Sequence, residues 1–244
     1  MLLYMHITGR VPINSCDFSI ESYSFDETND DFDLKDFDMN VTHDATKDGM
    51  IDMILRATEV VNRGWKQTSD KNVDLDDGSL KMFGSPWSPP TWMKIPSSKE
   101  DIKAGFEHAS VMTGSAQPSC LREGTSKSSK YAKAWALYIS KFITAYREYG
   151  VNLEAVTVQN EPEFPAPWEA CSYTPEAEAD FIGYHLGPQL DEVRSKKSSH
   201  WIRCVITLIC NVKYAIKNVL ILYHLLPYDW CYSYHSLFII LGSP

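Results

Sequence analysis

Short apolar segments that end in polar residues alternate along the first 195 residues with longer segments whose apolar positions recur at helical spacing. The expected strands cover residues 10–13, 80–87 and 154–161, and the expected helices cover residues 48–61, 131–149 and 174–187. Strands that alternate with helices indicate a parallel sheet, because parallel neighbours need a crossover connection. The pattern therefore predicts an α/β fold with three strand–helix units.

The helix expected at residues 131–149 has the strongest apolar stripe. The stripe consists of Trp135, Tyr138, Ile139, Phe142, Tyr146 and Tyr149. Gly150 follows directly and is placed to end the helix in the left-handed conformation that glycine adopts easily. Residues 62–79 are polar and lack periodicity, so we expect an inserted surface loop there.

The helix expected after Thr174 has the start signals of a capping threonine followed by a first-turn proline, Pro175. Its inner face is expected to carry Ala177, Phe181 and Tyr184. The Gly187-Pro188 pair is expected to end it, because proline cannot continue the backbone hydrogen bonds of a helix.

The segment from Glu154 to Glu161 is the expected strand that points most clearly to chemistry. Alternation places Val156 and Val158 on one face, whereas the other face carries Ala155, Thr157, Gln159 and Glu161. Pro162 disfavours helical backbone at Glu161 and supplies no N–H, so pairing is expected to stop there. Catalytic groups of parallel barrels lie at the C-terminal strand ends. Glu161 is therefore the candidate acid, although a glutamate at a strand end is more often a surface residue.

Composition and charge narrow the class of partner. The chain has 244 residues and a net charge of −9, which argues against nucleic acid. The six cysteines form no C-x-x-C pair and the seven histidines show no metal-ligand spacing, so no metal site is expected. Cys16 and Cys171 are expected to be buried thiols.

Targeting signals are few. The first ten residues lack a basic region followed by a long apolar core, so no signal peptide is visible. Asn40-Val41-Thr42 is an N-glycosylation sequon, which matters only if the chain is secreted.

An acidic stretch at residues 26–38 lacks the glycine and the spacing of a calcium-binding loop. We expect a solvated loop that covers Phe25, Phe32 and Phe37.

The chain changes character near residue 200. Residues 201–244 contain a single acidic residue, Asp229, and apolar runs that follow neither the strand nor the helix period. Charged residues interrupt these runs, which speaks against a membrane span. We therefore divide the chain into a domain at 1–200 and an unrelated hydrophobic tail at 201–244 that is mistranslated or disordered.

Three motifs in a fixed order then point to a family. Arg10–Ser19, Ser85–Lys94 and Ala155–Pro162 together resemble glycoside hydrolase family 30, and the likeness extends to Trp168–Glu176. It covers about residues 4–195. The Asn-Glu-Pro triplet alone is shared by several barrel glycosidases, so the specificity of the match comes from the three motifs together.

The resemblance implies a (β/α)₈ TIM barrel, of which this chain holds about strands 2–4 with their helices, unclosed. It implies Glu161 as the general acid/base and Asn160 as a hydrogen-bond partner of the sugar 2-hydroxyl. Asp17 and Trp87 match residues that hold the outer glucose hydroxyls, and Arg10 matches an arginine near the nucleophile. The alternative for Trp87 is a plain packing residue, and the alternative for Asp17 is a turn cap, which only the family match makes less favoured.

Retaining glycosidases need two carboxylates about 5–5.5 Å apart, one as acid/base and one as nucleophile. The family's nucleophile is a glutamate near the end of the seventh strand, and no glutamate of this chain matches it. An unclosed sheet also leaves strand edges and inward side chains exposed. We therefore expect the literal chain to fold poorly and to lack hydrolytic activity.

By resemblance, the function is that of a retaining glycoside hydrolase that cleaves the β-glucosidic bond of glucosylceramide in sphingolipid catabolism, without metal or organic cofactor. The expected partner is glucosylceramide or a related β-glucoside, including a lipid presented at a membrane surface, and the expected location is lysosomal or secreted. The alternatives are a family sister activity on β-1,6-glucan or xylan, and a truncated product that is not an enzyme.

Overall fold

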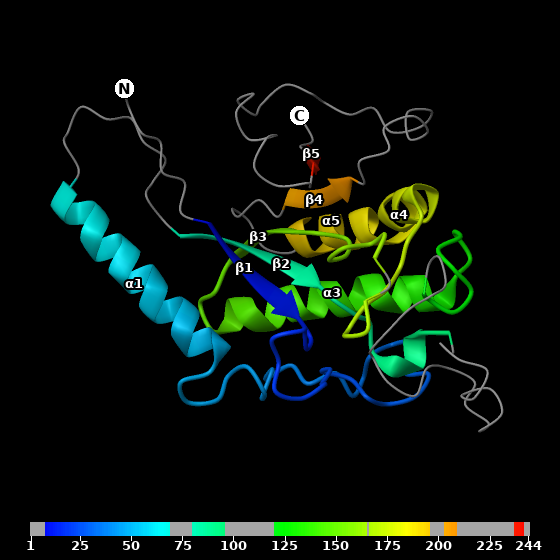
Figure 1. Cartoon of the computed structure of the whole chain (residues 1–244), viewed down its shortest axis with the longest axis horizontal. Coiled ribbons are helices and arrows are strands. Elements are labelled where there is room, and N and C mark those ends of the chain that lie inside the picture. Colours follow the sequence, from blue (N-terminus) through cyan, green and yellow to red (C-terminus); the bar gives the residue numbers. More distant parts are fainter. Residues whose placement is uncertain are drawn as a thin grey trace.

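A computed structural model describes residues 8–68, 80–95, 120–164, 166–195, 203–208 and 237–241 of the chain. Its centre is one five-stranded sheet in which the strands follow one another in chain order (Figure 1). The strands are β1 (Thr8–Ile13), β2 (Lys81–Pro86), β3 (Leu153–Val156), β4 (Arg203–Leu208) and β5 (Leu237–Leu241). The first four strands pair in parallel, and β5 is antiparallel to β4.

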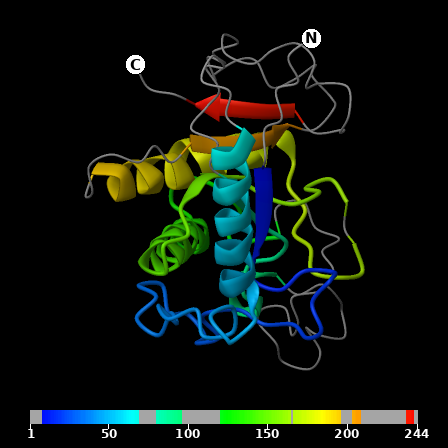
Figure 2. The same ribbon diagram turned by 90° about the vertical axis from the view of Figure 1, so that its left-hand side faces the viewer.

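Helices connect the parallel strands. They are α1 (Met50–Thr68), α3 (Lys130–Glu148), α4 (Pro175–Phe181), the π-helix η2 (Ile182–Leu186) and α5 (Gly187–Ser195), with a short 3-10 helix, η1 (Thr91–Met93), after β2. Figure 2 shows α3 and α5 on the same side of the strands. The sheet is not closed, and the prediction of a partial α/β barrel is confirmed.

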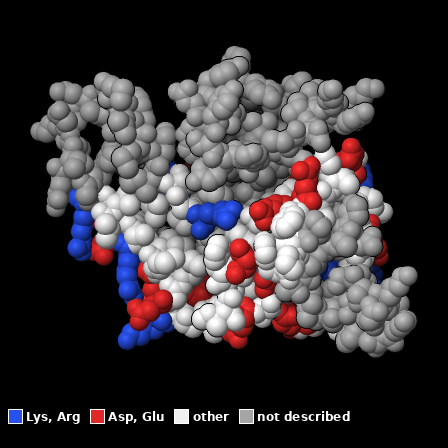
Figure 3. All heavy atoms as spheres, viewed as in Figure 1, with Lys and Arg blue, Asp and Glu red and all other residues white. Residues whose placement is uncertain are grey.

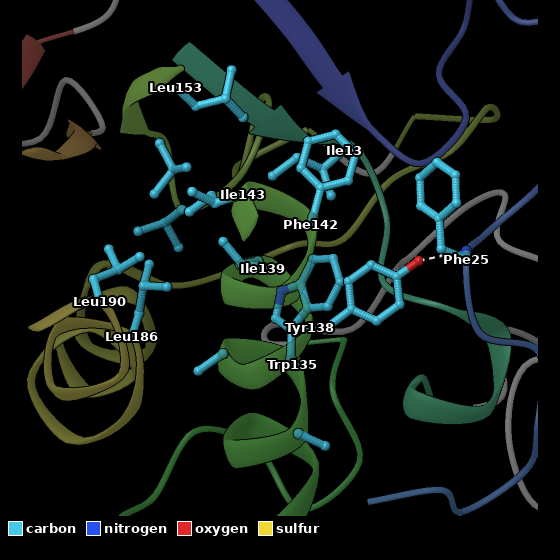
Figure 4. Packing of buried hydrophobic residues seen from close by; sticks show 14 of the residues in the cluster. Ile13, Phe25, Trp135, Tyr138, Ile139, Phe142, Ile143, Leu153, Leu186 and Leu190 are labelled. Atoms are coloured by element: carbon cyan, nitrogen blue, oxygen red, sulfur yellow. Dashed lines mark hydrogen bonds between the residues drawn. The ribbon is translucent and has the colours of Figure 1, made fainter. Parts of the chain in front are cut away.

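Helix α3 is the main support of the sheet. The Ser129 side chain accepts a hydrogen bond from the Ala132 N–H at 3.1 Å and caps the helix start. Gly150 has a φ of 83° at its end, as the sequence predicts. The predicted stripe is buried from Trp135 to Tyr146 and packs against the sheet and against Leu186 and Leu190 (Figure 4). Tyr149, expected in the same stripe, is exposed because it lies just beyond the last turn of the helix.

The sheet buries the face that meets this helix. Val11, Ile13 and Val156 have no exposed surface, whereas the neighbouring Arg10 is exposed. Gly84 of β2 lies between them, and a Cβ added there would be 3.2 Å from Ile13 Cδ1 and 3.4 Å from Val156 Cγ1. A side chain at this position would push Ile13 outward by a few tenths of an ångström, so glycine lets the two branched residues pack close to the strand.

The acidic stretch forms an ordered covering layer. Phe25 and Phe37 beneath it are buried, and Phe32 packs edge-to-face against Tyr131 with ring centres 5.0 Å apart. These contacts fit the expected loop over three phenylalanines.

Tyr138 connects α3 to the loops that follow the first two strands. Its hydroxyl oxygen accepts the Phe25 backbone N–H at 2.6 Å (Figure 4), and its O–H donates to Asn14 Oδ1. The Asn14 side-chain nitrogen in turn donates to the Ser88 carbonyl at 3.0 Å. The helix therefore fixes the loops at the C-terminal ends of β1 and β2.

Two helix boundaries differ from the sequence predictions. Helix α1 continues to Thr68, so residues 62–68 of the predicted surface loop are helical instead, and residues 69–79 lie outside the described residues. The helix from Thr174 continues past Gly187-Pro188 through η2 into α5. The π-helical turn changes the spacing of carbonyls and N–H groups just before the proline, which relieves the expected clash.

The excess of acidic residues is spread over the surface. On the face shown in Figure 3, acidic side chains are scattered widely and basic ones gather over α1. Among the helices of the described segments, none combines the length and the apolar character that crossing a bilayer requires.

Candidate active site

The candidate site lies where β1, β2 and β3 end. Regular β3 stops at Val156, earlier than predicted, yet the following residues stay attached to β2. The Thr157 N–H donates to the Gly84 carbonyl at 2.9 Å, and the Asn160 N–H donates to the Pro86 carbonyl at 2.7 Å. The chain therefore reaches Glu161 along the edge of β2, although the pairing is no longer regular.

Side chains reinforce this attachment. The Ser85 and Thr157 hydroxyls share a buried hydrogen bond of 2.7 Å, and the Gln159 amide nitrogen donates to the Trp87 carbonyl at 2.6 Å. Because both bonds are shielded from water, they hold the segment before Glu161 in one position.

Three of the predicted site residues are in contact. Arg10, on the less covered face of β1, donates to Asn160 Oδ1 at 3.2 Å. Its guanidinium carbon lies 4.5 Å from the ring centre of Trp87, within cation–π range. Trp87 is buried, with only 3% of its surface exposed. The resulting Arg10–Trp87–Asn160 cluster joins the middle of β1 to the residues that follow β2 and β3.

Glu161 and Asp17 are less constrained. Both side chains are exposed, and neither forms any of the hydrogen bonds or ion pairs found within the described ranges. Glu161 has a φ of 46°, which is unusual for a residue other than glycine and particularly for one that precedes proline. The sequence predicts an extended backbone here, and the structure has a left-handed one. Residues in such sparsely populated conformations often occur at functional sites.

Sequence reasoning assigned no role to Glu169. This carboxylate is buried, and its Oε1 accepts the Ser15 hydroxyl at 2.9 Å and the Ser22 hydroxyl at 2.6 Å. It ties the loop after β1 to the loop after β3. The sequence signal for a role was its position inside the Trp168–Glu176 motif. Its burial could not be predicted, because an irregular loop has no periodic pattern that separates buried from exposed positions.

Lys94 lies next to this carboxylate and is also buried. Its Nζ donates to the Ala170 carbonyl at 2.9 Å. Burial lowers the pKa of Lys94 to about 7, while Glu169 acts in the opposite direction. The ammonium group helps to hold the loop that carries Glu169.

A disulfide joins Cys120 to Cys171, so the expectation that Cys171 is a free thiol is wrong. Cys16 is free and buried, as expected. The Cys120 N–H also donates to the Ser172 carbonyl at 3.0 Å, and the Ile95 N–H donates to the Cys120 carbonyl at 2.8 Å. The segments after β2 and β3 are thereby connected covalently and by hydrogen bonds.

Glu178 of α4 is a buried carboxyl group just beyond the loop that connects β3 to α4. Neither of its oxygens has a hydrogen-bond partner among the described residues. Burial, followed by the charge of Glu163, raises its pKa to about 8. The folded chain therefore keeps this group protonated where the unfolded chain ionises it.

Glu178 makes the stability of the fold dependent on pH. Its contribution is fully present below the unfolded pKa of about 4.5 and is lost as the pH rises toward about 8. We expect the urea midpoint to fall between about pH 5 and about pH 7.5, and Glu178→Gln to remove most of that fall. Asp26, whose pKa burial raises to about 6, leaves a smaller residual slope. A Glu178→Gln slope equal to that of the parent chain would contradict this account.

No group of three or more His, Cys, Asp or Glu side chains suited to a metal ion occurs in the part of the chain that the structure describes. The predicted site residues at the strand ends bring together a carboxyl group, an amide, a guanidinium and an indole. This geometry defines the chain as part of an α/β barrel with a polar site at its C-terminal strand ends.

Sequence comparison identifies the family. The profile of the glycosyl hydrolase family 30 TIM-barrel domain matches residues 3–207, and the chain belongs to this family. A putative glucosylceramidase 3 of Caenorhabditis elegans is 33% identical over 75% of this chain and 29% of its own length. The lysosomal acid glucosylceramidase of Mus musculus is 31% identical over 74% of this chain and 29% of its own length. The chain thus spans less than a third of these relatives.

A solved structure supports the same fold. SrfJ from Salmonella typhimurium superposes with a TM-score of 0.57 at 24% identity, covering 82% of this chain and 35% of that protein. The family match also extends into β4, which lies beyond the predicted domain boundary at residue 200. That boundary and the interpretation of residues 201–244 stay predictions.

Proposed function

We propose that this chain supplies the acid/base half of a retaining β-glucosidase site that acts on glucosylceramide or a related β-glucoside. Membership of family 30 supports the glycosidase class, and two glucosylceramidases at 31–33% identity favour the substrate. The main structural support is the Arg10–Trp87–Asn160 cluster beside Glu161.

In this proposal each side chain has one task. Glu161 protonates the glycosidic oxygen and later activates the water that releases the sugar. Asn160 binds the sugar 2-hydroxyl, and its side-chain oxygen is held by Arg10 at 3.2 Å, which leaves its amide nitrogen to face the substrate. Trp87 and Asp17 hold the outer hydroxyls. The guanidinium of Arg10 also favours the ionised form of a carboxylate placed next to it.

The second carboxylate is expected to come from outside residues 1–244, because no glutamate of this chain matches the nucleophile that the resemblance to family 30 implies. We therefore expect purified residues 1–244 to hydrolyse no chromogenic β-glucoside. Chemistry becomes testable in a chimera in which residues 3–207 replace the matching segment of the mouse relative, which then supplies the remaining strands.

The chimera should hydrolyse 4-nitrophenyl β-glucoside at acidic pH and should release β-glucose first, as a retaining enzyme does. Proton NMR of the fresh product distinguishes the anomers. Release of α-glucose, or a folded chimera without any activity, would refute the proposal.

A relative that acts on a different polymer suggests β-1,6-glucan as a second candidate substrate. The endo-1,6-beta-D-glucanase neg1 of Aspergillus fumigatus is 34% identical over 46% of this chain and 22% of its own length. Assaying the chimera on glucosylceramide and on a β-1,6-glucan side by side separates the two. Preference for the glucan would replace the lipid assignment while keeping the glycosidase.

We also propose a lysosomal or secreted location. The disulfide between Cys120 and Cys171 supports it, because structural disulfides form mainly in oxidising compartments. The lysosomal relative points in the same direction. Whether a membrane surface presents the substrate is part of this proposal, and it is tested by comparing glucosylceramide in vesicles with the same lipid in detergent.

A further inference from the structure

The loop between β1 and α1 carries a candidate site of covalent modification that the glycosidase does not use. Asn40-Val41-Thr42 matches the acceptor sequence for N-linked oligosaccharides, Asn-x-Ser/Thr. Sequence alone says little, because such triplets occur in many proteins that never meet the transferase. What decides is the local structure and the compartment in which the chain folds.

The asparagine lies on an exposed turn that a carboxylate stabilises. Asp38 accepts the Asn40 N–H at 3.0 Å and the Thr42 N–H at 2.7 Å, and the Val41 side chain between them is fully buried. The buried valine anchors the turn, so the side chains on either side of it extend outward. Both Asn40 and Thr42 are exposed.

The acceptor group itself is free. The Asn40 side-chain amide forms none of the hydrogen bonds found among the residues with described positions. Only its backbone is engaged, through the N–H to Asp38 and through the carbonyl, which accepts the Tyr149 hydroxyl at 2.8 Å. A sugar attached to the amide therefore displaces no contact that the fold needs.

A buried asparagine illustrates the difference. Asn14 has no exposed surface, and its amide nitrogen donates to the Ser88 carbonyl. Modification there would remove a buried hydrogen bond and require space that the core does not have.

The position relative to the active site is also favourable. Tyr149 directly follows the last residue of α3, and the chain from there leads into the start of β3. Asn40 therefore lies at the end of α3 next to the N-terminal ends of the strands. Trp87 and Glu161 follow the opposite, C-terminal ends of β2 and β3, and Arg10 contacts Trp87 there, so a bulky sugar at Asn40 leaves them accessible.

The disulfide supplies an independent indication of compartment. Cys120 and Cys171 are bonded, and structural disulfides are formed mainly in the secretory pathway, where the oligosaccharide donor is also found. We infer that Asn40 carries an N-linked oligosaccharide when the chain is made in that pathway. This inference goes beyond the glycosidase activity and needs only the luminal location.

The chemistry is a single group transfer. Asn40 Nδ2 bonds to C1 of the first sugar of a polyprenyl-diphosphate oligosaccharide, and the bond between C1 and the phosphate oxygen breaks. The amide loses one proton, and the lipid diphosphate leaves. An external transferase catalyses the step, and no oxidant or reductant takes part.

The test translates the chain behind a cleavable signal sequence with microsomes and examines only the protease-protected fraction. We expect one discrete upward mass shift that peptide N-glycosidase removes, with conversion of Asn40 to aspartate seen by peptide mass spectrometry. Asn40→Gln and Thr42→Ala should abolish the shift, whereas Thr42→Ser should retain it. Asn152→Gln is the matched control, because Asn152 is exposed but starts no acceptor triplet.

Thr42→Ala removes only a side chain, since the Thr42 contact to Asp38 uses the backbone N–H. Its loss of glycan is therefore not a folding artefact, and equal urea midpoints of the unmodified variants verify this. A protected parent chain without an enzyme-sensitive shift overturns the inference, as does a shift that persists in Asn40→Gln. Either result leaves the glycosidase proposal untouched.

Discussion

Replacement of Glu161 by glutamine will lower the turnover of the barrel chimera by about a hundred- to ten-thousand-fold, the range that general acid–base catalysis contributes. Glutamine has nearly the same shape but carries no transferable proton. The fold should be unaffected, because the Glu161 side chain is exposed and forms no hydrogen bond or ion pair in the described structure. Steady-state rates on a β-glucoside with a poor leaving group measure the effect.

Leaving-group dependence distinguishes an acid/base from a residue that merely supports the fold. A dinitrophenyl glucoside needs little protonation, so its first step should lose far less than that of an alkyl glucoside. Glu163→Gln is the matched control, since Glu163 is an exposed glutamate two residues further along. If both glutamine variants lose the same activity on all substrates, Glu161 is not the acid.

The second large effect concerns the disulfide. Replacing both Cys120 and Cys171 by serine should lower the free energy of unfolding by about 2–5 kcal/mol, as is usual for native disulfides. The bond links residues 51 positions apart and joins the segments after β2 and β3, so its loss frees a long stretch of the unfolded chain. Urea unfolding measured by circular dichroism gives the difference.

Reductant provides the internal control. The parent chain should lose the same stability when reduced, whereas the double serine variant should not respond. The variant keeps the other four cysteines, including the buried Cys16, so any effect of reductant on it would have to come from one of these. Equal midpoints for the oxidised and reduced parent chain would show that the bond does not stabilise the fold.

The sequence predicted helices α3 and α4 well, because apolar periodicity and capping residues lie within the helices themselves. The stripe from Trp135 to Tyr146 is buried as expected, and Thr174 caps α4 through the Ala177 N–H at 3.2 Å. The predicted end of that helix at Gly187-Pro188 was wrong, because a π-helical turn accommodates Pro188. The local sequence carries no signal for such a turn. Tyr184, expected inside, is exposed, and His185 is buried instead.

The site could be predicted only in part. The motifs identified Arg10, Trp87 and Asn160, and the structure brings these three together. Their pairwise contacts depend on how strand ends meet, which no single segment encodes. The role of Glu169 and the partner of Cys171 were missed for the same reason, since each depends on a residue far away in the chain. The catalytic roles themselves stay proposals.

The π-helix η2 has a consequence for how this part of the chain tolerates change. Its five residues form a wider turn than the α-helical one, and Leu186 at its end and Leu190 in α5 are buried in the same apolar cluster as the stripe of α3. Because successive residues are about 100° apart around a helix, deleting one would rotate α5 and carry both leucines away from their partners. In homologous proteins we therefore expect substitutions at the exposed positions of η2 and α5, but no insertion or deletion within η2.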